Sequence, residues 1–164
     1  MNREQTVGTR SFYVIAVTVA LLDQISKLLV QQMLRLGEII SVIPSFFNLT
    51  HVLNPGAAFG FLAGAPAAFR SPFFTAIALF AALFIIYYRF RHPRMGLLPS
   101  LGLSFILGGA VGNLVDRLRL GMVVDFLDFY YGAYHWPAFN IADSAITVGV
   151  TLMVVEIFTD RRKG

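Results

Sequence analysis

The sequence predicts an all-α membrane protein, a single domain folded as a four-transmembrane-helix bundle. The chain has 164 residues, of which 57% are hydrophobic and 13% are charged, whereas soluble domains carry about 25% charged residues. Its mean hydropathy is +0.70. The apolar residues gather in runs long enough to cross a bilayer, roughly 12–33, 71–88, 95–115 and 138–158.

The first run follows a polar start that carries Arg3 and Arg10. It could be the apolar core of a cleaved secretory signal or a first transmembrane helix. No A-x-A cleavage site follows, and the apolar pattern continues past Asp23 and Lys27. We therefore favour a transmembrane helix over 12–33.

Asp23 and Lys27 lie four residues apart on one face of this predicted helix, with the acid first, which favours an ion pair. Either the pair only lets an apolar helix tolerate two charges, or it supports a polar site inside the bundle. Structural support is the preferred interpretation, because a mutually satisfied pair has little capacity left for chemistry.

The connection 34–70 mixes apolar and polar residues. Its segment SVIPSFFNLTHVLN is rich in β-branched and aromatic types and predicts one or two short strands at the interface. NPGAAFG follows, in which Pro55 and Gly56 indicate a break. This break leads either into a short interfacial helix or into a re-entrant loop, where Asn54 offers a donor and an acceptor to a substrate backbone.

The basic residues predict the orientation. Four spans place both ends of the chain on the side of the loop 89–94. That side carries most of the cations, namely Arg3, Arg10, Arg89, Arg91, Arg94, Arg161, Arg162 and Lys163. The positive-inside rule makes it cytoplasmic, so that 34–70 and 116–137 are extracytoplasmic. The bias is not absolute, since the outer side carries Arg35, Arg70 and Arg119.

This topology brings the scattered polar residues to the outer boundary of the bilayer. They are Asp23, Lys27, Asn113, Asp116, Arg117, Asp125, Asn140 and Asp143. A charge at the bilayer centre costs at least ~2.5–3.5 kcal/mol, so each ionisable residue here is a functional candidate. Glu156 and Asp160, at the inner boundary, are ordinary helix-end charges.

Asp125 and Asp143 form the candidate catalytic pair. Asp125 has apolar neighbours on both sides, and Asp143 lies near the start of the last span, where it or Asn140 could instead cap the helix. Two carboxylates held close in an apolar place share one proton. One then acts as a base toward water while the other polarises a carbonyl, so peptide hydrolysis is the hypothesis.

The remaining polar and small residues receive structural predictions. Asp116 and Arg117 are expected to form ion pairs that brace the outer helix ends, and Asp128 to be solvated. Gly108 and Gly112 form a small-xxx-small face for helix packing. An aromatic belt is expected from Tyr130, Tyr131, Tyr134 and Trp136.

The composition argues against several other chemistries. The absence of cysteine excludes disulfides, thiol nucleophiles and thiolate metal sites. His51, His92 and His135 lack metal-ligand spacing, and neither an HExxH motif nor a phosphate loop is present. The net charge of +4 lies in short clusters, so nucleic acid is not an expected partner. No cofactor or metal is expected.

Two rival classes use similar residues. A proton-coupled transporter also carries intramembrane Asp and Lys, but it should show polar residues through the full depth or a repeat in two halves. A non-catalytic scaffold would use the aspartates for packing alone, and their substitution by Asn would change stability rather than turnover.

Five motifs in order resemble those of bacterial lipoprotein signal peptidase (signal peptidase II). They are DQISK (23–27), NPGAAFG (54–60), GGAVGNLVDR (108–117), VVDF (123–126) and FNIADS (139–144). The resemblance covers nearly the whole chain. It implies an aspartic intramembrane protease of the bacterial inner membrane, which removes the signal peptide of diacylglyceryl-modified prolipoproteins just before the lipid-bearing cysteine.

The resemblance also implies the roles of single residues. Asp125 and Asp143 would be the catalytic dyad, near the periplasmic face. Polar residues that line or support the site would be Asn54, Asn113, Arg117 and Asn140, and to these we add Gly56, Asp116, Asp23 and Lys27 as support. A small extracytoplasmic β-cradle with a short interfacial helix would cover the substrate, and globomycin-type peptides would block the cleft. We expect a monomer.

Overall fold

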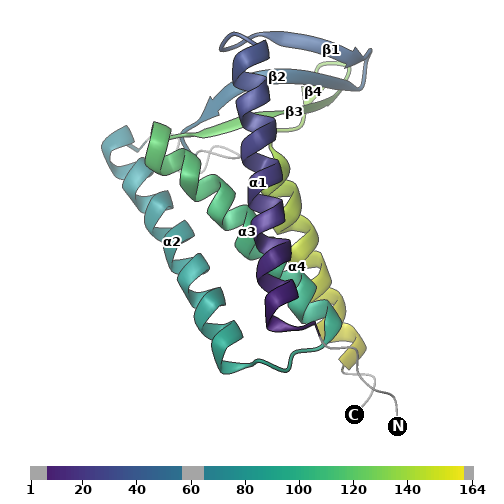
Figure 1. Ribbon diagram of the computed structural model, residues 1–164. Helices are drawn as coiled ribbons and strands as arrows, with labels where there is room; N and C mark the ends of the chain where they lie inside the picture. Colours follow the sequence, from purple (N-terminus) through teal and green to yellow (C-terminus); the bar gives the residue numbers. More distant parts are fainter. Residues whose placement is uncertain (1–6, 57–64, 161–164) are drawn as a thin grey trace.

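A computed structural model describes residues 7–56 and 65–160, and it places a small sheet at one end of a bundle of long helices (Figure 1). The helices are α1 (Thr9–Met33), α2 (Ala67–Arg91), α3 (Leu97–Leu120) and α4 (Ile141–Asp160). The strands are β1 (Ile39–Ile43), β2 (Phe47–Asn54), β3 (Val123–Tyr131) and β4 (Tyr134–His135).

The described part of the chain contains four helices long and apolar enough to cross a membrane, as the predicted fold class requires. Their bounds differ from the predicted ranges: α1 and α2 begin earlier, because backbone hydrogen bonding continues into flanks that hydropathy excludes, whereas α3 and α4 begin and end later. The end of α3 has a local cause. Gly121 adopts a left-handed conformation (φ 71°) and donates its N–H to the Arg117 carbonyl at 3.0 Å, which closes the last turn.

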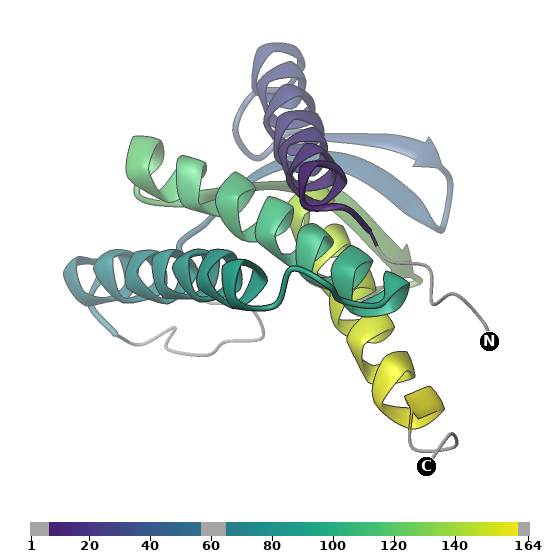
Figure 2. The ribbon, with the colours of Figure 1, turned by 60° about the horizontal axis from the view of Figure 1, so that its bottom comes forward.

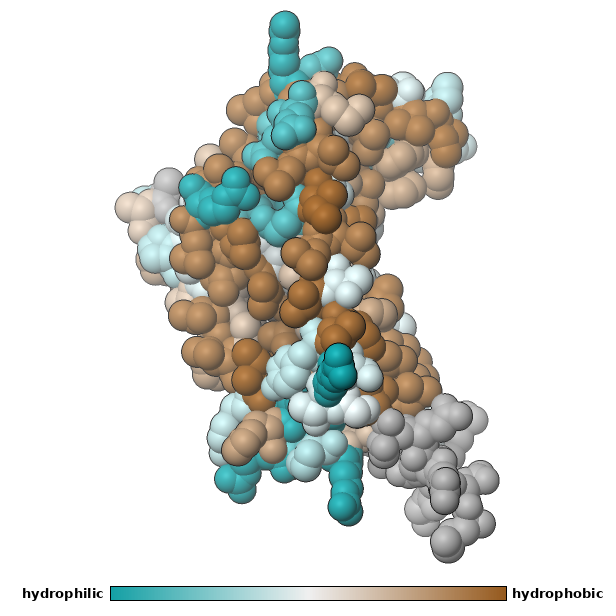
Figure 3. All heavy atoms as spheres, viewed as in Figure 1, coloured by the Kyte–Doolittle hydropathy of each residue, from teal (hydrophilic) through white to brown (hydrophobic). Residues whose placement is uncertain are grey.

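Helix α3 is the centre of the bundle and packs against α1, α2 and α4 (Figure 2). In the apolar stretch of α3, 50% of the residues are buried, whereas in the other three helices no more than 22% are. On the face that Figure 3 shows, the surface along the helices is mainly apolar, and hydrophilic residues concentrate toward the two ends. The other helices therefore present most of their side chains to the lipid.

Glycines of α3 allow α1 and α4 to pack closely against it. An added Cβ at Gly108 would lie 2.6 Å from the Ala16 carbonyl of α1, and one at Gly112 would lie 2.5 Å from the Asp23 carboxylate. The predicted small-xxx-small face is thus confirmed as the α1–α3 contact. A second face meets α4, where a Cβ on Gly109 would collide with the Ala142 carbonyl. This contact positions the first turn of α4.

The sheet has the order β1-β2-β3-β4 and is antiparallel throughout. β1 and β2 confirm the strands predicted in the first outer connection. No strand was predicted in the 116–137 connection, and the structure adds β3 and β4 there. Strand β3 pairs along β2 and places Asp125 opposite Val52. Its apolar, β-branched and aromatic residues pair because β2 offers them a complementary edge.

The start of α1, the α2–α3 loop and the end of α4 lie at the end of the bundle away from the sheet (Figures 1 and 2). An even number of spans produces this arrangement. The segment after the Pro55–Gly56 break was expected to form either a short interfacial helix or a re-entrant loop. Residues 57–64 of this segment lie outside the described residues.

Candidate active site

Asp125 is held in β3 with both carboxylate oxygens engaged. Asn140 donates its side-chain amide to Oδ1 at 2.7 Å, and Asn54 donates its amide to Oδ2 at 2.8 Å. The side chain is buried, since the residue is 1% exposed. Strands β2 and β3 and the start of α4 therefore converge on this one carboxylate.

Asp143 lies in the first turn of α4 and takes part in a capping box. Asn140 Oδ1 accepts the Asp143 N–H at 2.9 Å, while Asp143 Oδ2 accepts the Asn140 N–H at 3.3 Å. The helix-cap interpretation thus holds for both residues. Capping leaves Asp143 Oδ1 available, and this oxygen accepts the Asn113 amide from α3 at 2.8 Å.

Asn140 connects the two aspartates. It is fully buried (0% exposed), its backbone and Oδ1 bond to Asp143, and its amide donates to Asp125. The two carboxylates, separate in the sequence, are therefore held within hydrogen-bonding reach of one residue. Both aspartates thus contact the same residue, and their role as a catalytic pair stays a prediction.

The electrostatic environment of Asp125 favours a bound proton. The pKa of Asp125 is raised from 3.8 to about 7. Burial is the largest cause and the neighbouring Asp143 charge adds to it, while the hydrogen bonds of Asn54 and Asn140 and the charge of Lys27 oppose them. Burial dominates because removal from water penalises the ionised form. The group is thus poised to exchange a proton near neutral pH.

A buried charge cluster supports this pair. Lys27 Nζ lies 2.8 Å from Asp23 Oδ2, 2.8 Å from Asp116 Oδ2 and 2.9 Å from Asn113 Oδ1. Asp23 Oδ1 accepts the Ala142 N–H at 2.9 Å, which fixes the α4 turn that carries the candidate carboxylate. These contacts reach beyond the Asp23–Lys27 pair, so they favour the alternative that the pair supports a polar site inside the bundle over the preferred interpretation of a self-contained pair.

The prediction of ion pairs at the outer helix ends, which named no partner in advance, holds for Asp116. Asp116 pairs with Lys27 of α1 and accepts the Val124 N–H of β3 at 3.1 Å, so it joins α3 to α1 and to the sheet. Successive residues on a helix point in different directions. Arg117 faces the other way, and its guanidinium lies 6.0 Å from the centroid of the Phe74 ring.

One supporting residue was missed. Gln24 donates its amide to Asp116 Oδ1 at 2.9 Å and to the Gly112 carbonyl at 3.0 Å. It completes the shell around the cluster from the α1 side. Its position inside an apolar span, between the singled-out Asp23 and Lys27, was a signal that could have identified it.

A cavity of about 590 Å³ opens beside the pair. Asp143, Asn113 and Arg117 line it together with apolar residues that include Phe139 and Val148. Asn54 and Gly56 also line it. Gly56 has φ +93°, and any side chain there would collide with the Phe74 ring. Asp125 is not part of the wall and adjoins the cavity through Asn54.

One prediction about the outer region needs correction. Asp128 is not solvated, since it is 6% exposed and its carboxylate accepts the Asn48 amide at 2.8 Å and contacts His135 Nδ1 at 2.8 Å. The position of Asp128 in β3, beside β2 and β4, buries it. Of the aromatic belt, Tyr131, Tyr134 and Trp136 are exposed, but Tyr130 stacks on His135.

The fold and the site define a small polytopic membrane protein in which a buried asparagine holds two carboxylates beside an apolar cavity, at one end of the helix bundle. Comparison with known proteins identifies the group more closely. The chain belongs to the signal peptidase II family, a family of proteases, since the model described as "Signal peptidase (SPase) II" matches residues 15–159.

Curated relatives and solved structures agree with this membership. The chain is 50% identical over 152 residues to a lipoprotein signal peptidase of Syntrophus aciditrophicus, covering 93% of this chain and 94% of the relative. It is 52% identical over 140 residues to one of Desulforapulum autotrophicum, covering 85% and 86%. A structure described as a bacterial membrane enzyme at 2.3 Å resolution is 32% identical, with TM-score 0.84, covering 98% of this chain and 94% of that one.

Proposed function

We propose that this protein is an aspartic endopeptidase that removes the signal peptide from diacylglyceryl-modified prolipoproteins, cutting just before the lipid-modified cysteine. The observation that supports the proposal most directly is the hydrogen bonding of Asn140 to both Asp125 and Asp143. Membership of the signal peptidase II family supports the substrate class.

In the proposed mechanism the pair holds a single proton, because two carboxylates this close cannot both ionise easily. The ionised aspartate removes a proton from water, whose oxygen attacks the scissile carbonyl carbon. The protonated partner donates its proton to the carbonyl oxygen. Collapse of the tetrahedral intermediate breaks the C–N bond, with a proton returned to the departing amine.

The surrounding side chains have positioning roles in this scheme. Asn113 and Asn140 orient Asp143, and movement of the Asn54 amide away from Asp125 opens that carboxylate to a water in the cavity. The cationic Arg117, which lines the cavity, offers donors to the substrate backbone. The apolar part of the wall suits the signal peptide and acyl chains, and a globomycin-type cyclic peptide would compete for the same space.

The direct test is cleavage of a defined precursor by the purified protein. A diacylglyceryl-modified precursor is expected to yield two fragments, one of which begins with the lipid-modified cysteine by mass spectrometry. The matched control is the same precursor without the lipid, which should remain intact. Cleavage at another bond, or equal cleavage of both precursors, would contradict the proposed specificity.

The activity should depend on pH around neutrality. Because the pKa of Asp125 is raised to about 7, the single-proton form of the pair predominates below this value and is lost above it. We expect kcat/KM to fall with an apparent pKa of about 7 as the pH rises. A profile measured with the lipid-modified precursor over about pH 5 to 9 tests this. An activity that rises through neutrality and stays high would contradict it.

We further propose that the protein lies in the bacterial inner membrane, with the sheet on the periplasmic side and both ends in the cytoplasm. The native chain has no cysteine, so single introduced cysteines can be labelled cleanly. A membrane-impermeant maleimide added to intact spheroplasts should modify Tyr131→Cys and should modify Arg94→Cys only after lysis. The reverse pattern would overturn the orientation.

A further inference from the structure

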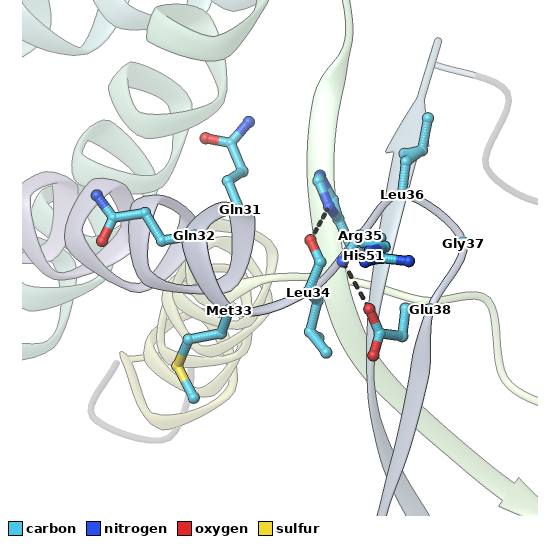
Figure 4. Close-up of a pocket in the computed structure, with 9 residues that line it drawn as sticks. All are labelled: Gln31, Gln32, Met33, Leu34, Arg35, Leu36, Gly37, Glu38 and His51. Carbon is cyan, nitrogen blue, oxygen red and sulfur yellow. Dashed lines mark hydrogen bonds between the residues drawn. The ribbon is translucent and has the colours of Figure 1, made fainter.

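A second pocket lies at the sheet end of α1, where the chain passes into β1 (Figure 4). Its volume is about 990 Å³, and it shares no lining residue with the cavity beside the aspartates. Its polar lining comes from Gln31, Gln32, Arg35, Glu38 and His51. The proposed peptidase mechanism uses none of these side chains.

The pocket presents a cation and an anion that do not neutralise each other. Glu38 Oε2 accepts the backbone N–H of Arg35 at 2.8 Å, so the carboxylate is held by the main chain rather than by the guanidinium (Figure 4). Within residues 7–56 and 65–160, no carboxylate lies within ion-pair distance of the Arg35 guanidinium. Both charges are thus available to a ligand.

His51 adds an acceptor to the pocket wall. Its Nδ1 lies 3.0 Å from the Leu34 carbonyl, and since a carbonyl only accepts, Nδ1 carries the hydrogen. In the neutral ring Nε2 is then an acceptor. The residue is 8% exposed, and this Nε2 has no partner among the residues that the structure describes. A buried acceptor of this kind costs free energy until a donor reaches it.

The pocket continues the lipid-facing surface of α1. Leu29 and Met33 are exposed along the helix, and Leu36 and Ile39 extend this apolar surface onto the start of the sheet. A ligand with acyl chains could lay them along α1 while its polar part enters the pocket. The occupant is therefore expected to be amphipathic, and its head must carry both a negative group and a hydrogen-bond donor.

We propose that this pocket binds the headgroup of a phospholipid that carries a phosphate and a primary ammonium, a phosphoethanolamine lipid of the leaflet on the sheet side. The phosphate accepts from the Arg35 guanidinium, a geometry that suits arginine. The ammonium donates to Glu38 and His51. A choline head has no N–H to donate, so the pocket discriminates against it.

The test is native mass spectrometry of the purified full-length protein in detergent with equimolar phosphatidylethanolamine, phosphatidylcholine and phosphatidylglycerol. The wild type should retain one phosphatidylethanolamine in preference to the other lipids. Glu38→Gln should lose about three- to tenfold of the preference over phosphatidylcholine, and Arg35→Gln should weaken retention of all three phospholipids by a similar factor, as expected for loss of one charged contact. Arg119→Gln, an exposed arginine outside the pocket, is the matched control and should behave as the wild type.

Several outcomes would overturn the proposal. Equal retention of the three lipids would indicate ordinary surrounding lipid, and an unchanged preference in Glu38→Gln would remove the carboxylate from recognition. Binding of soluble phosphoethanolamine as tightly as the lipid would contradict a membrane source. Because the variants lie outside the proposed dyad, precursor cleavage in detergent should be unchanged in all of them, which also shows that they are folded.

Discussion

Asp125→Asn and Asp143→Asn are each expected to lower kcat for precursor cleavage by at least about 10³-fold, the scale on which loss of one member of a catalytic unit acts. Each substitution removes either the base that deprotonates the attacking water or the acid that donates a proton to the scissile carbonyl oxygen. Asn has nearly the same shape, so the cavity and its apolar wall remain. Turnover is measured with the lipid-modified precursor, under single-turnover conditions.

Asp128→Asn provides a closely matched control. Asp128 is also a buried carboxylate of β3 and also accepts an asparagine amide, but its partners are Asn48 and His135 rather than the proposed dyad. It should retain near-normal kcat. If a folded Asp125→Asn or Asp143→Asn variant cleaves at close to the wild-type rate, the proposed dyad is wrong.

The pH dependence of thermal stability tests the state of Asp125 without any measurement of activity. The pKa of Asp125 is raised from 3.8 to about 7 in the folded protein, so between these values the folded state holds a proton that the unfolded state has lost. The contribution of Asp125 to the free energy of unfolding therefore falls as pH rises through this window. Asp125→Asn lacks that decline, and its Tm should drop less than that of the wild type between pH 5 and pH 8.

Lys27→Met is expected to lower the free energy of unfolding by about 3–5 kcal/mol, the usual cost of removing one partner from a buried ion pair. Lys27 is 1% exposed, and its ammonium group contacts Asp23, Asp116 and Asn113. Its loss leaves two buried carboxylates without a cation. The midpoint of denaturant-induced unfolding in mixed micelles measures the effect.

A double variant tests whether charge causes this loss. Lys27→Met combined with Asp116→Asn removes one of the stranded carboxylates and should recover part of the stability, which a double-mutant cycle reports as coupling. Arg119→Met, at an exposed cation at the end of α3, should change stability by less than about 0.5 kcal/mol. Similar losses in Lys27→Met and Arg119→Met would show that the buried cluster is not the cause.

The sequence predicted those parts of the protein that depend on local pattern. Apolar run length predicted the helices, because a bilayer-spanning segment must satisfy its own backbone hydrogen bonds whatever its neighbours. Placing a charged side chain inside such a run costs free energy, so the sequence indicates Asp23, Lys27 and Asp143 as functional candidates. The apolar neighbours of Asp125 made it a candidate before any partner was known.

Contacts between segments far apart in the chain could not be predicted from local sequence pattern. That Asp116 pairs with Lys27 rather than with Arg117, and that Asp128 is buried, depend on how α3 and β3 lie against α1 and β2. The stability of a strand depends on its pairing with residues far apart in the chain, and no local periodicity in the sequence indicates that pairing. The same reason hid β3 and β4 within the second outer connection.

From the amino-acid order alone came the membrane-spanning class, the candidate acids and the family resemblance, since each rests on composition or on spacing along the chain. Tertiary structure alone decided that Asn140 both caps α4 and donates to Asp125, and that Asp23 holds the turn which carries Asp143. The physical reason is that a buried polar group must find its partner in space, and that partner is set by how helices and strands pack.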